Sequence, residues 1–201
     1  YDRKFRGPTT LRRGLENSIN VVTVKLIQQI GVEPVIRMAH QMGIESELRP
    51  EIALALGVSE VTPLELTSAY GVLATGGLRA EPVAIRKVTD SQGRILEEHV
   101  PEPQAVMRPE TAFVLTNVMK GVIERGTATR ARALKRPLAG KTGTTSEATD
   151  VWFIGFTPNL VAGVWVGYDI KKSLGPAETG GRMALPLWIA LMQRILPHIT
   201  V

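Results

Sequence analysis

The stretch LAGKTGTTSEATDVWFIGFTP (residues 138–158) places a lysine, a glycine and several hydroxyl residues directly before an apolar, aromatic run. Its core, Lys141-Thr142-Gly143-Thr144, can end a phosphate-binding loop, form a surface turn, or line a strand edge that holds an anionic substrate. The phosphate loop GxxxxGK[ST] needs a glycine at position 135, where the chain has Lys135, and Pro137 removes a backbone N–H from the expected cradle. This leaves the turn and the strand edge.

The apolar run that follows decides the fold class. Residues 151–168, VWFIGFTPNLVAGVWVGY, carry no charge over a length close to the minimum for a membrane-spanning helix. Thr157-Pro158-Asn159 interrupts the run in its middle, and glycines and β-branched residues crowd both halves. We therefore predict two strands joined by a turn and covered on both faces, not a membrane helix.

The residues before this hairpin change from a helical to a strand period. Apolar spacing predicts helices over 9–30, 34–42 and 63–75, the first with a possible break near Gly14 and a cap at Thr9 or Thr10. Residues 81–100 instead alternate around the turn 90–93, which predicts a β-hairpin. The expected helical part is thus about 9–76.

Two further helices complete the pattern. The helix predicted over 109–124 has on one side the apolar residues Phe113, Val114, Val118 and Val122. A closing helix from about Pro186 has on one side Leu185, Trp188, Ile189, Met192 and Leu196. The sheet and closing helices should occupy about 80–198, which gives one α+β domain with an antiparallel sheet.

Composition excludes several functions. The net charge is +5, but the 24 basic residues are scattered among 19 acidic ones and aromatics make up 5%, so we expect no nucleic-acid partner. With no cysteine there is no disulfide and no thiolate metal ligand. His40, His99 and His198 have no carboxylate companions at metal-binding spacing. We expect neither a metal nor a cofactor.

A second short motif, Ser18-Ile19-Asn20, precedes an apolar helical run, where its two polar side chains can face one cleft. Alone it is compatible with a helix cap. Together, Ser-x-Asn and Lys-Thr-Gly are two of the three motifs of the penicillin-recognising serine acyltransferases. The chain resembles the transpeptidase domain of class A penicillin-binding proteins, the bifunctional enzymes that polymerise and crosslink bacterial peptidoglycan. The stretches that carry this resemblance are FRGPTTLRRGLENSINVVTVKL, TPLELTSAYGVLATGG, GTATRARAL, GKTGTT, TDVWFIGFTPNLVAGVWVGYD and ETGGRMALPLWIALM.

The resemblance implies a β-lactamase/transpeptidase-like α+β fold over residues 1–201, with an antiparallel sheet flanked by helices. The third motif, SxxK, carries the nucleophilic serine, and no serine of this chain has a lysine three positions later. We therefore expect a partial domain, incomplete at its N-terminal side, with SxxK upstream of Tyr1.

The resemblance also implies a reaction: a D,D-transpeptidase crosslinks peptidoglycan stem peptides by serine acyl transfer and is trapped by β-lactam antibiotics. Ser18 and Lys141 would relay a proton, and Asn20 would orient the substrate amide. The residues implied in substrate binding are Thr142, Gly143, Thr144 and Thr145. Among these, the hydroxyls would bind the donor carboxylate and the Thr144 N–H would stabilise the oxyanion.

The resemblance further implies a place in the cell, namely the extracytoplasmic (periplasmic) face of the bacterial inner membrane, with anchoring through a segment outside this chain. Two other interpretations stay open at this stage. One is a non-catalytic penicillin-binding-like module that only binds peptide. The other is a basic scaffold protein of the cell wall that would bind peptidoglycan without Lys141.

Overall fold

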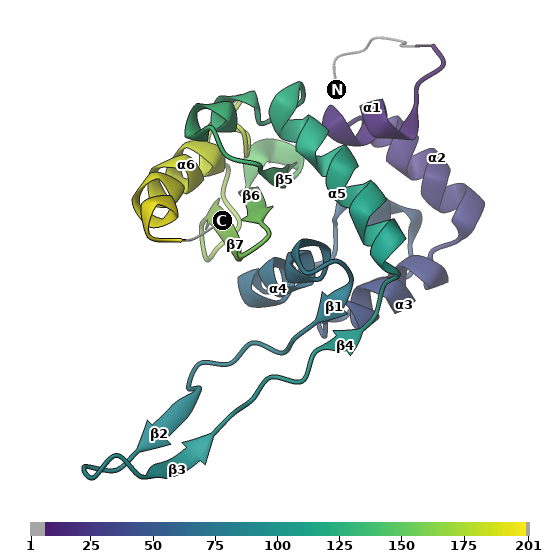
Figure 1. Cartoon of the computed structure of the whole chain (residues 1–201). Helices are drawn as coiled ribbons and strands as arrows, with labels where there is room; N and C mark the ends of the chain where they lie inside the picture. Colours follow the sequence, from purple (N-terminus) through teal and green to yellow (C-terminus); the bar gives the residue numbers. More distant parts are fainter. Residues whose placement is uncertain (1–6, 200–201) are drawn as a thin grey trace.

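The computed structural model describes residues 7–199 and places a helical body, a three-stranded sheet and a projecting hairpin in one α+β arrangement (Figure 1). The chain begins with α1 (Leu11–Glu16), α2 (Asn20–Ile30) and α3 (Glu33–Gln41). A short 3₁₀ helix, η1 (Ile52–Leu56), follows and leads to α4 (Pro63–Ala74).

The first predicted helix is interrupted later than expected. Thr10 caps α1 by accepting a hydrogen bond from the Arg13 N–H at 3.2 Å, as predicted. The break does not lie at Gly14, which stays helical and buried because α2 packs against it: a Cβ there would lie 2.6 Å from a Val22 methyl. The interruption falls at Ser18, whose φ is 53°. The helix prediction was correct in type and wrong in the position of the break.

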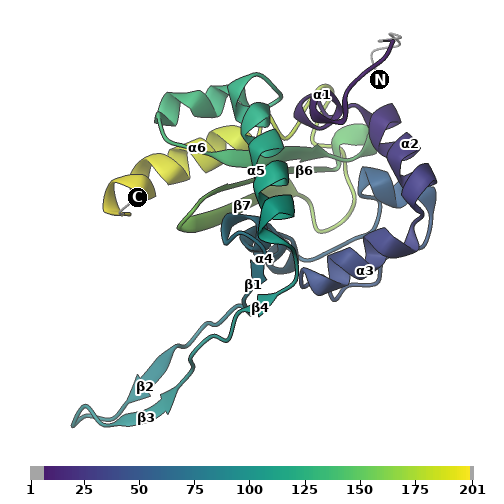
Figure 2. The same ribbon diagram turned by 45° about the vertical axis from the view of Figure 1, so that its right-hand side comes forward.

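The predicted hairpin around 90–93 is present and projects from the body as an arm (Figures 1 and 2). At its base β1 (Leu78–Arg79) pairs with β4 (Gln104–Ala105), and further out β2 (Lys87–Thr89) pairs with β3 (Ile95–Glu98), both antiparallel. The apolar side chains of the arm stay exposed: Ile85, Ile95, Leu96 and Val100.

Helix α5 (Pro109–Glu124) has the predicted bounds, and the predicted apolar face is confirmed at Val122, which is buried. Phe113 is 70% exposed and Val114 is also exposed, so the predicted apolar face was wrong at these two positions. The buried residues of α5 include small as well as large side chains, namely Ala112, Met119, Gly121, Val122 and Ile123. A 3₁₀ helix, η2 (Thr129–Leu134), follows.

The sheet has the order β5-β6-β7 and is antiparallel throughout. Strand β5 (Ala139–Thr144) is joined through η3 (Ser146–Ala148) to β6 (Asp150–Thr157), which a two-residue turn links to β7 (Leu160–Gly167). The predicted hairpin over 151–168 is therefore confirmed. Within residues 7–199, β5 pairs with β6 alone and forms one edge of the sheet.

Helices cover both faces of this sheet. Helix α6 (Ala184–Ile195), followed by the 3₁₀ helix η4 (Leu196–His198), lies on one face and α4 on the other (Figure 2). Phe153 packs edge-on against Trp188 of α6 with ring centroids 4.9 Å apart, while Phe156 meets Tyr70 of α4 at 6.4 Å. The predicted inner side of the closing helix is confirmed at Leu185, Trp188 and Met192, all of which are buried.

All residues of β6 except Asp150 and Trp152 are buried, whereas no residue of β7, the other edge strand within residues 7–199, is fully buried. The expectation that both strands are covered on both faces was therefore wrong for β7. No helix within residues 7–199 is both long and apolar enough to span a bilayer.

Candidate functional site

Ser18 lies in a turn whose backbone is fixed by the end of α1. The Ile19 N–H donates to the Gly14 carbonyl at 2.8 Å and the Ser18 N–H to the Leu15 carbonyl at 3.2 Å, the two bonds of a Schellman motif. Ser18 occupies the left-handed position of that motif, where glycine is usual. Its conformation is strained, and strained residues concentrate at functional sites.

Lys141 reaches this turn from β5. Its Nζ donates to Ser18 Oγ at 2.8 Å and to the Thr142 carbonyl at 2.8 Å. Burial disfavours the ammonium form and lowers the pKa of Lys141 to about 8. The structure thus brings together the two motifs that the sequence suggested. It also brings the pKa of Lys141 near neutral pH, where the side chain can both lose and regain a proton.

Thr142 follows Lys141 in β5. Its hydroxyl shares a hydrogen bond of 2.8 Å with the hydroxyl of Thr127, which lies between α5 and η2. Thr127 is therefore a member of the site that the motif analysis did not single out, although it lies in GTATRARAL, one of the stretches used for the resemblance.

Gly143 and Thr144 are enclosed by the loop that precedes α6. The Gly180 N–H donates to Thr144 Oγ1 at 3.1 Å, and a Cβ on Gly180 would collide with the Trp152 carbonyl and lie 2.5 Å from the Gly143 carbonyl. A Cβ on Gly143 would lie 3.1 Å from Trp152 Cβ. The missing side chain at Gly143 thus serves the chain's own packing against Trp152.

Two predicted residues stand apart from this group. The Thr145 hydroxyl shares a hydrogen bond of 2.8 Å with Thr149, and the Asp150 N–H donates to Thr145 Oγ1 at 2.9 Å, so Thr145 closes the turn after β5. Asn20 begins α2 on the exposed side, and its side chain makes no hydrogen bond to any residue of the described range.

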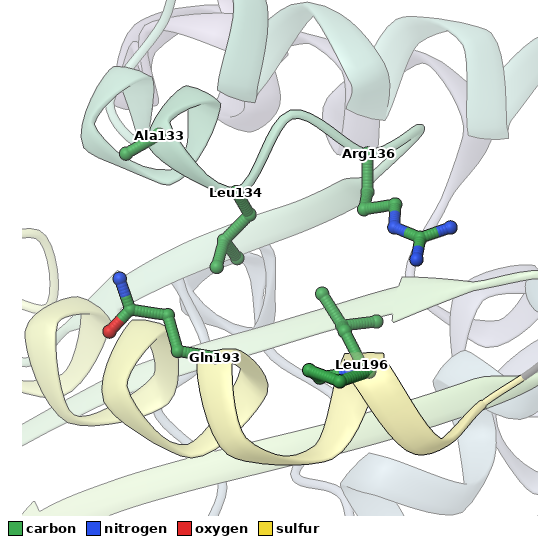
Figure 3. Close-up of a pocket in the computed structure, with 6 residues that line it drawn as sticks. Ala133, Leu134, Arg136, Gln193 and Leu196 are labelled. Carbon is green, nitrogen blue, oxygen red and sulfur yellow. The ribbon is translucent and has the colours of Figure 1, made fainter.

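Two hollows of the structure lie away from Ser18 and Lys141. One of about 320 Å³ lies between η2 and the end of α6 and is lined by Leu134, Arg136 and Leu196 among others (Figure 3). Another is lined by Arg86, His99 and their neighbours in the arm. Over residues 7–199 no cluster of three or more histidine, aspartate or glutamate residues has a metal-binding arrangement.

Comparison with known proteins agrees with this geometry. The family model described as the penicillin binding protein transpeptidase domain matches residues 1–192. The chain belongs to this transpeptidase family. The family match covers the Ser18 turn and the strand β5 that carries Lys141, and it confirms both the resemblance and the α+β transpeptidase fold.

Individual relatives of this transpeptidase domain extend the comparison. Penicillin-binding protein 1A of Aquifex aeolicus is 48% identical over 194 residues, which are 96% of this chain and 26% of that protein. Penicillin-binding protein 1A of Neisseria lactamica is 39% identical over 200 residues, 96% of this chain and 25% of that protein. The chain therefore spans about a quarter of the length of these curated relatives.

Solved structures share the fold. The crystal structure of penicillin-binding protein 1A from Haemophilus influenzae matches with a TM-score of 0.91 at 29% identity, over 96% of this chain and 35% of that one. The PonA1 protein from Mycobacterium tuberculosis in complex with penicillin V matches with a TM-score of 0.83 at 25% identity, over 98% of this chain and 59% of that one.

Proposed function

We propose that this chain is the substrate-binding and proton-relay part of a peptidoglycan D,D-transpeptidase that acts by serine acyl transfer and binds β-lactams. The observation that carries the proposal is the 2.8 Å contact between Lys141 Nζ and Ser18 Oγ, two groups 123 residues apart in the sequence. They meet beside β5, an edge strand of the described sheet and hence one that an extended peptide can approach.

The geometry supports a division of labour. Because Lys141 donates to the Ser18 oxygen, the Ser18 hydroxyl hydrogen is free to point elsewhere. When the donor peptide bond breaks, Ser18 gives that proton to the leaving amine and recovers one from Lys141. A lysine with a pKa of about 8 suits this exchange, since general acids work best near the operating pH.

Substrate binding follows from the same strand. The positive charge of Lys141 attracts the terminal carboxylate of the donor, and the hydroxyls of Thr142 and Thr144 add hydrogen bonds to it. The Thr144 N–H would be one oxyanion donor. Thr145 would border the bound peptide, and Asn20, which has an exposed and uncommitted side chain, would orient its amide. The reaction itself needs no metal or cofactor.

The proposal extends to partners and location. The attacking serine would belong to an SxxK segment outside residues 1–201, and the complete protein would be anchored at the periplasmic face of the inner membrane. Its partners are peptidoglycan stem peptides and β-lactam antibiotics, not nucleic acid. The similarity to the penicillin V complex of PonA1 and to the penicillin-binding proteins 1A supports this assignment.

Labelling with a fluorescent penicillin tests the function. We expect the complete gene product to form a covalent adduct that survives denaturation, and the isolated 201-residue chain to form none. A stoichiometric adduct on the isolated chain would refute the upstream nucleophile. Absence of labelling in a complete, folded gene product would favour the alternative, a peptide-binding module without catalysis.

A further inference from the structure

A buried carboxylate lies two residues before Ser18. Glu16, the last residue of α1, is 4% exposed, which is the lowest exposure of any acidic or basic residue within residues 7–199. Burying a carboxylate is costly unless partners compensate for its lost hydration. Glu16 must therefore be held by specific partners.

Those partners come from the C-terminal end of α5. Arg125 donates to Glu16 twice, from Nη2 to Oε1 at 2.6 Å and from Nε to Oε2 at 3.0 Å. Glu16 raises the pKa of Arg125, and Arg12 approaches the same carboxylate at 3.8 Å. Two parallel hydrogen bonds from a planar guanidinium fix orientation as well as distance.

Two glycines make room for this contact. A Cβ on Gly121 would collide with Glu16 Oε1 and lie 2.7 Å from Arg125 Nη2. A Cβ on Gly126 would collide with the Glu16 carbonyl oxygen. Helix α1 therefore packs closely against the C-terminal end of α5 at Glu16.

The same residue connects both halves of the site. The Glu16 carbonyl accepts a hydrogen bond from the Thr127 N–H at 3.2 Å. Thr127 binds Thr142 through the two hydroxyls at 2.8 Å, and Lys141, the neighbour of Thr142, donates to Ser18 at 2.8 Å. These hydrogen bonds connect Glu16 to Ser18 through β5, and the backbone of Asn17 connects Ser18 back to Glu16.

We propose that Glu16 is a positioning residue whose contacts with Arg125 and Thr127 hold the Ser18 turn at hydrogen-bonding distance from Lys141. It touches no substrate and acts through Ser18 and Thr127. The inference rests on the proposed function for the catalytic meaning of the Ser18–Lys141 pair, but the position of that pair can be measured independently of catalysis.

The test uses Gly121→Ala, which removes no polar group from the protein but displaces the Glu16 carboxylate. Gly71→Ala in α4 is the matched control, because a Cβ there meets nothing within 4 Å. Competitive labelling of lysines with an amine reagent across a pH series, read by mass spectrometry in the complete protein, gives the pKa of Lys141. We expect this pKa to rise in Gly121→Ala by at least one unit as water enters, which lowers labelling at pH 7.5 roughly tenfold. It should stay unchanged in Gly71→Ala.

Arg125→Lys provides a second route that does not depend on the folding of Gly121→Ala. Lysine keeps the charge but cannot make the two-point contact, and the Arg125 side chain is 51% exposed. The Lys141 pKa should again rise. If both folded variants lower the melting temperature and leave the Lys141 pKa at its wild-type value, Glu16 is merely structural and the proposal is wrong.

Acylation by a fluorescent penicillin separates this inference from the proposed function. If the Lys141 pKa moves as expected and the wild-type protein is also acylated, the rate of acylation should fall in the variants in the same order. If the pKa moves and the wild-type protein is never acylated, the positioning role of Glu16 stands while the proposed function fails.

Discussion

Strand β5, paired with β6, and the arm formed by β2 and β3 are both antiparallel, yet they differ in what surrounds them. Along β5, the side chains of Lys141, Thr142 and Thr144 each have a hydrogen-bond partner from another part of the chain. The arm instead leaves Ile95 and Leu96 exposed on a projecting hairpin. Polar residues can thus be the more constrained ones, and apolar alternation does not guarantee burial.

The glycines of the arm and of the site also differ in how closely they are surrounded. Gly93 in the arm has a φ of 80° and open space around its Cα, so it serves a turn conformation. Gly180 beside β5 serves close approach, since its Cα faces the backbone of Gly143 and Trp152. The arm uses glycine for backbone shape, and the site uses it for space.

Removing the lysine of β5 should have the largest effect. In the complete protein we expect Lys141→Ala to reduce the rate of penicillin acylation roughly a hundredfold or more. The variant removes the positive charge that faces the carboxylate of the penicillin, and truncating one partner of such a desolvated charge pair costs about 2–5 kcal/mol. Lys171→Ala is the control, since Lys171 forms an exposed ion pair with Glu60 at 2.9 Å. Equal acylation rates in the two variants would mean that Lys141 takes no part in the reaction.

The buried lysine should also make stability depend on pH. The pKa of Lys141 falls from 10.5 to about 8, so the unfolded chain binds more protons between these values and stability rises with pH across that window. Burying the charged form of Lys141 destabilises the folded state by about 3 kcal/mol at most, and this loss is present in full below pH 8. Urea unfolding from pH 7 to 10.5 should show this gain in the wild-type protein and not in Lys141→Met. Parallel pH profiles would contradict the burial of the charge.

Replacing a glycine by alanine should destabilise the protein less in the arm than beside β5. We expect Gly180→Ala to lower the free energy of unfolding by about 1–3 kcal/mol through overpacking. Gly93→Ala should cost about 1 kcal/mol through its left-handed backbone alone. Urea melts of both variants measure the difference, and a Gly180→Ala protein as stable as the wild type would show that the loop before α6 can move away.

The smallest effect should come from the apolar surface of the arm. Leu96→Ala should change the free energy of unfolding by less than about 0.5 kcal/mol, because the side chain is exposed. Leu73→Ala, the matched change at a buried leucine of α4, should cost about 2–5 kcal/mol. A large loss from Leu96→Ala would indicate that the arm packs against another surface in solution.

The sequence predicted those elements whose signals are local. The hairpin over 151–168 followed from β-branched residues around Pro158-Asn159, and the two motifs followed from Ser18 and Lys141. Packing was harder to foresee: the face of α5 depends on which neighbours arrive, so Phe113 read as core and is exposed. The break before α2 was misplaced because a serine at a left-handed position has no distinctive sequence signal.

Tertiary partners of the site were also hidden in the sequence. Thr127 and Gly180 belong to segments far from both motifs, and only the folded chain brings them to Thr142 and Thr144. No pattern in the sequence marks Glu16 as buried, because its burial depends on glycines more than a hundred residues away.

The left-handed turn at Ser18 has a consequence for how this domain can vary. Glycine at that position would relieve about 1 kcal/mol of backbone strain, yet it would remove the hydroxyl that Lys141 binds. Selection for thermal tolerance and selection for catalysis therefore favour different residues there. A library of variants selected for heat resistance should accumulate glycine at position 18. The same library, selected for growth of cells whose wall synthesis depends on this domain, should lose glycine there.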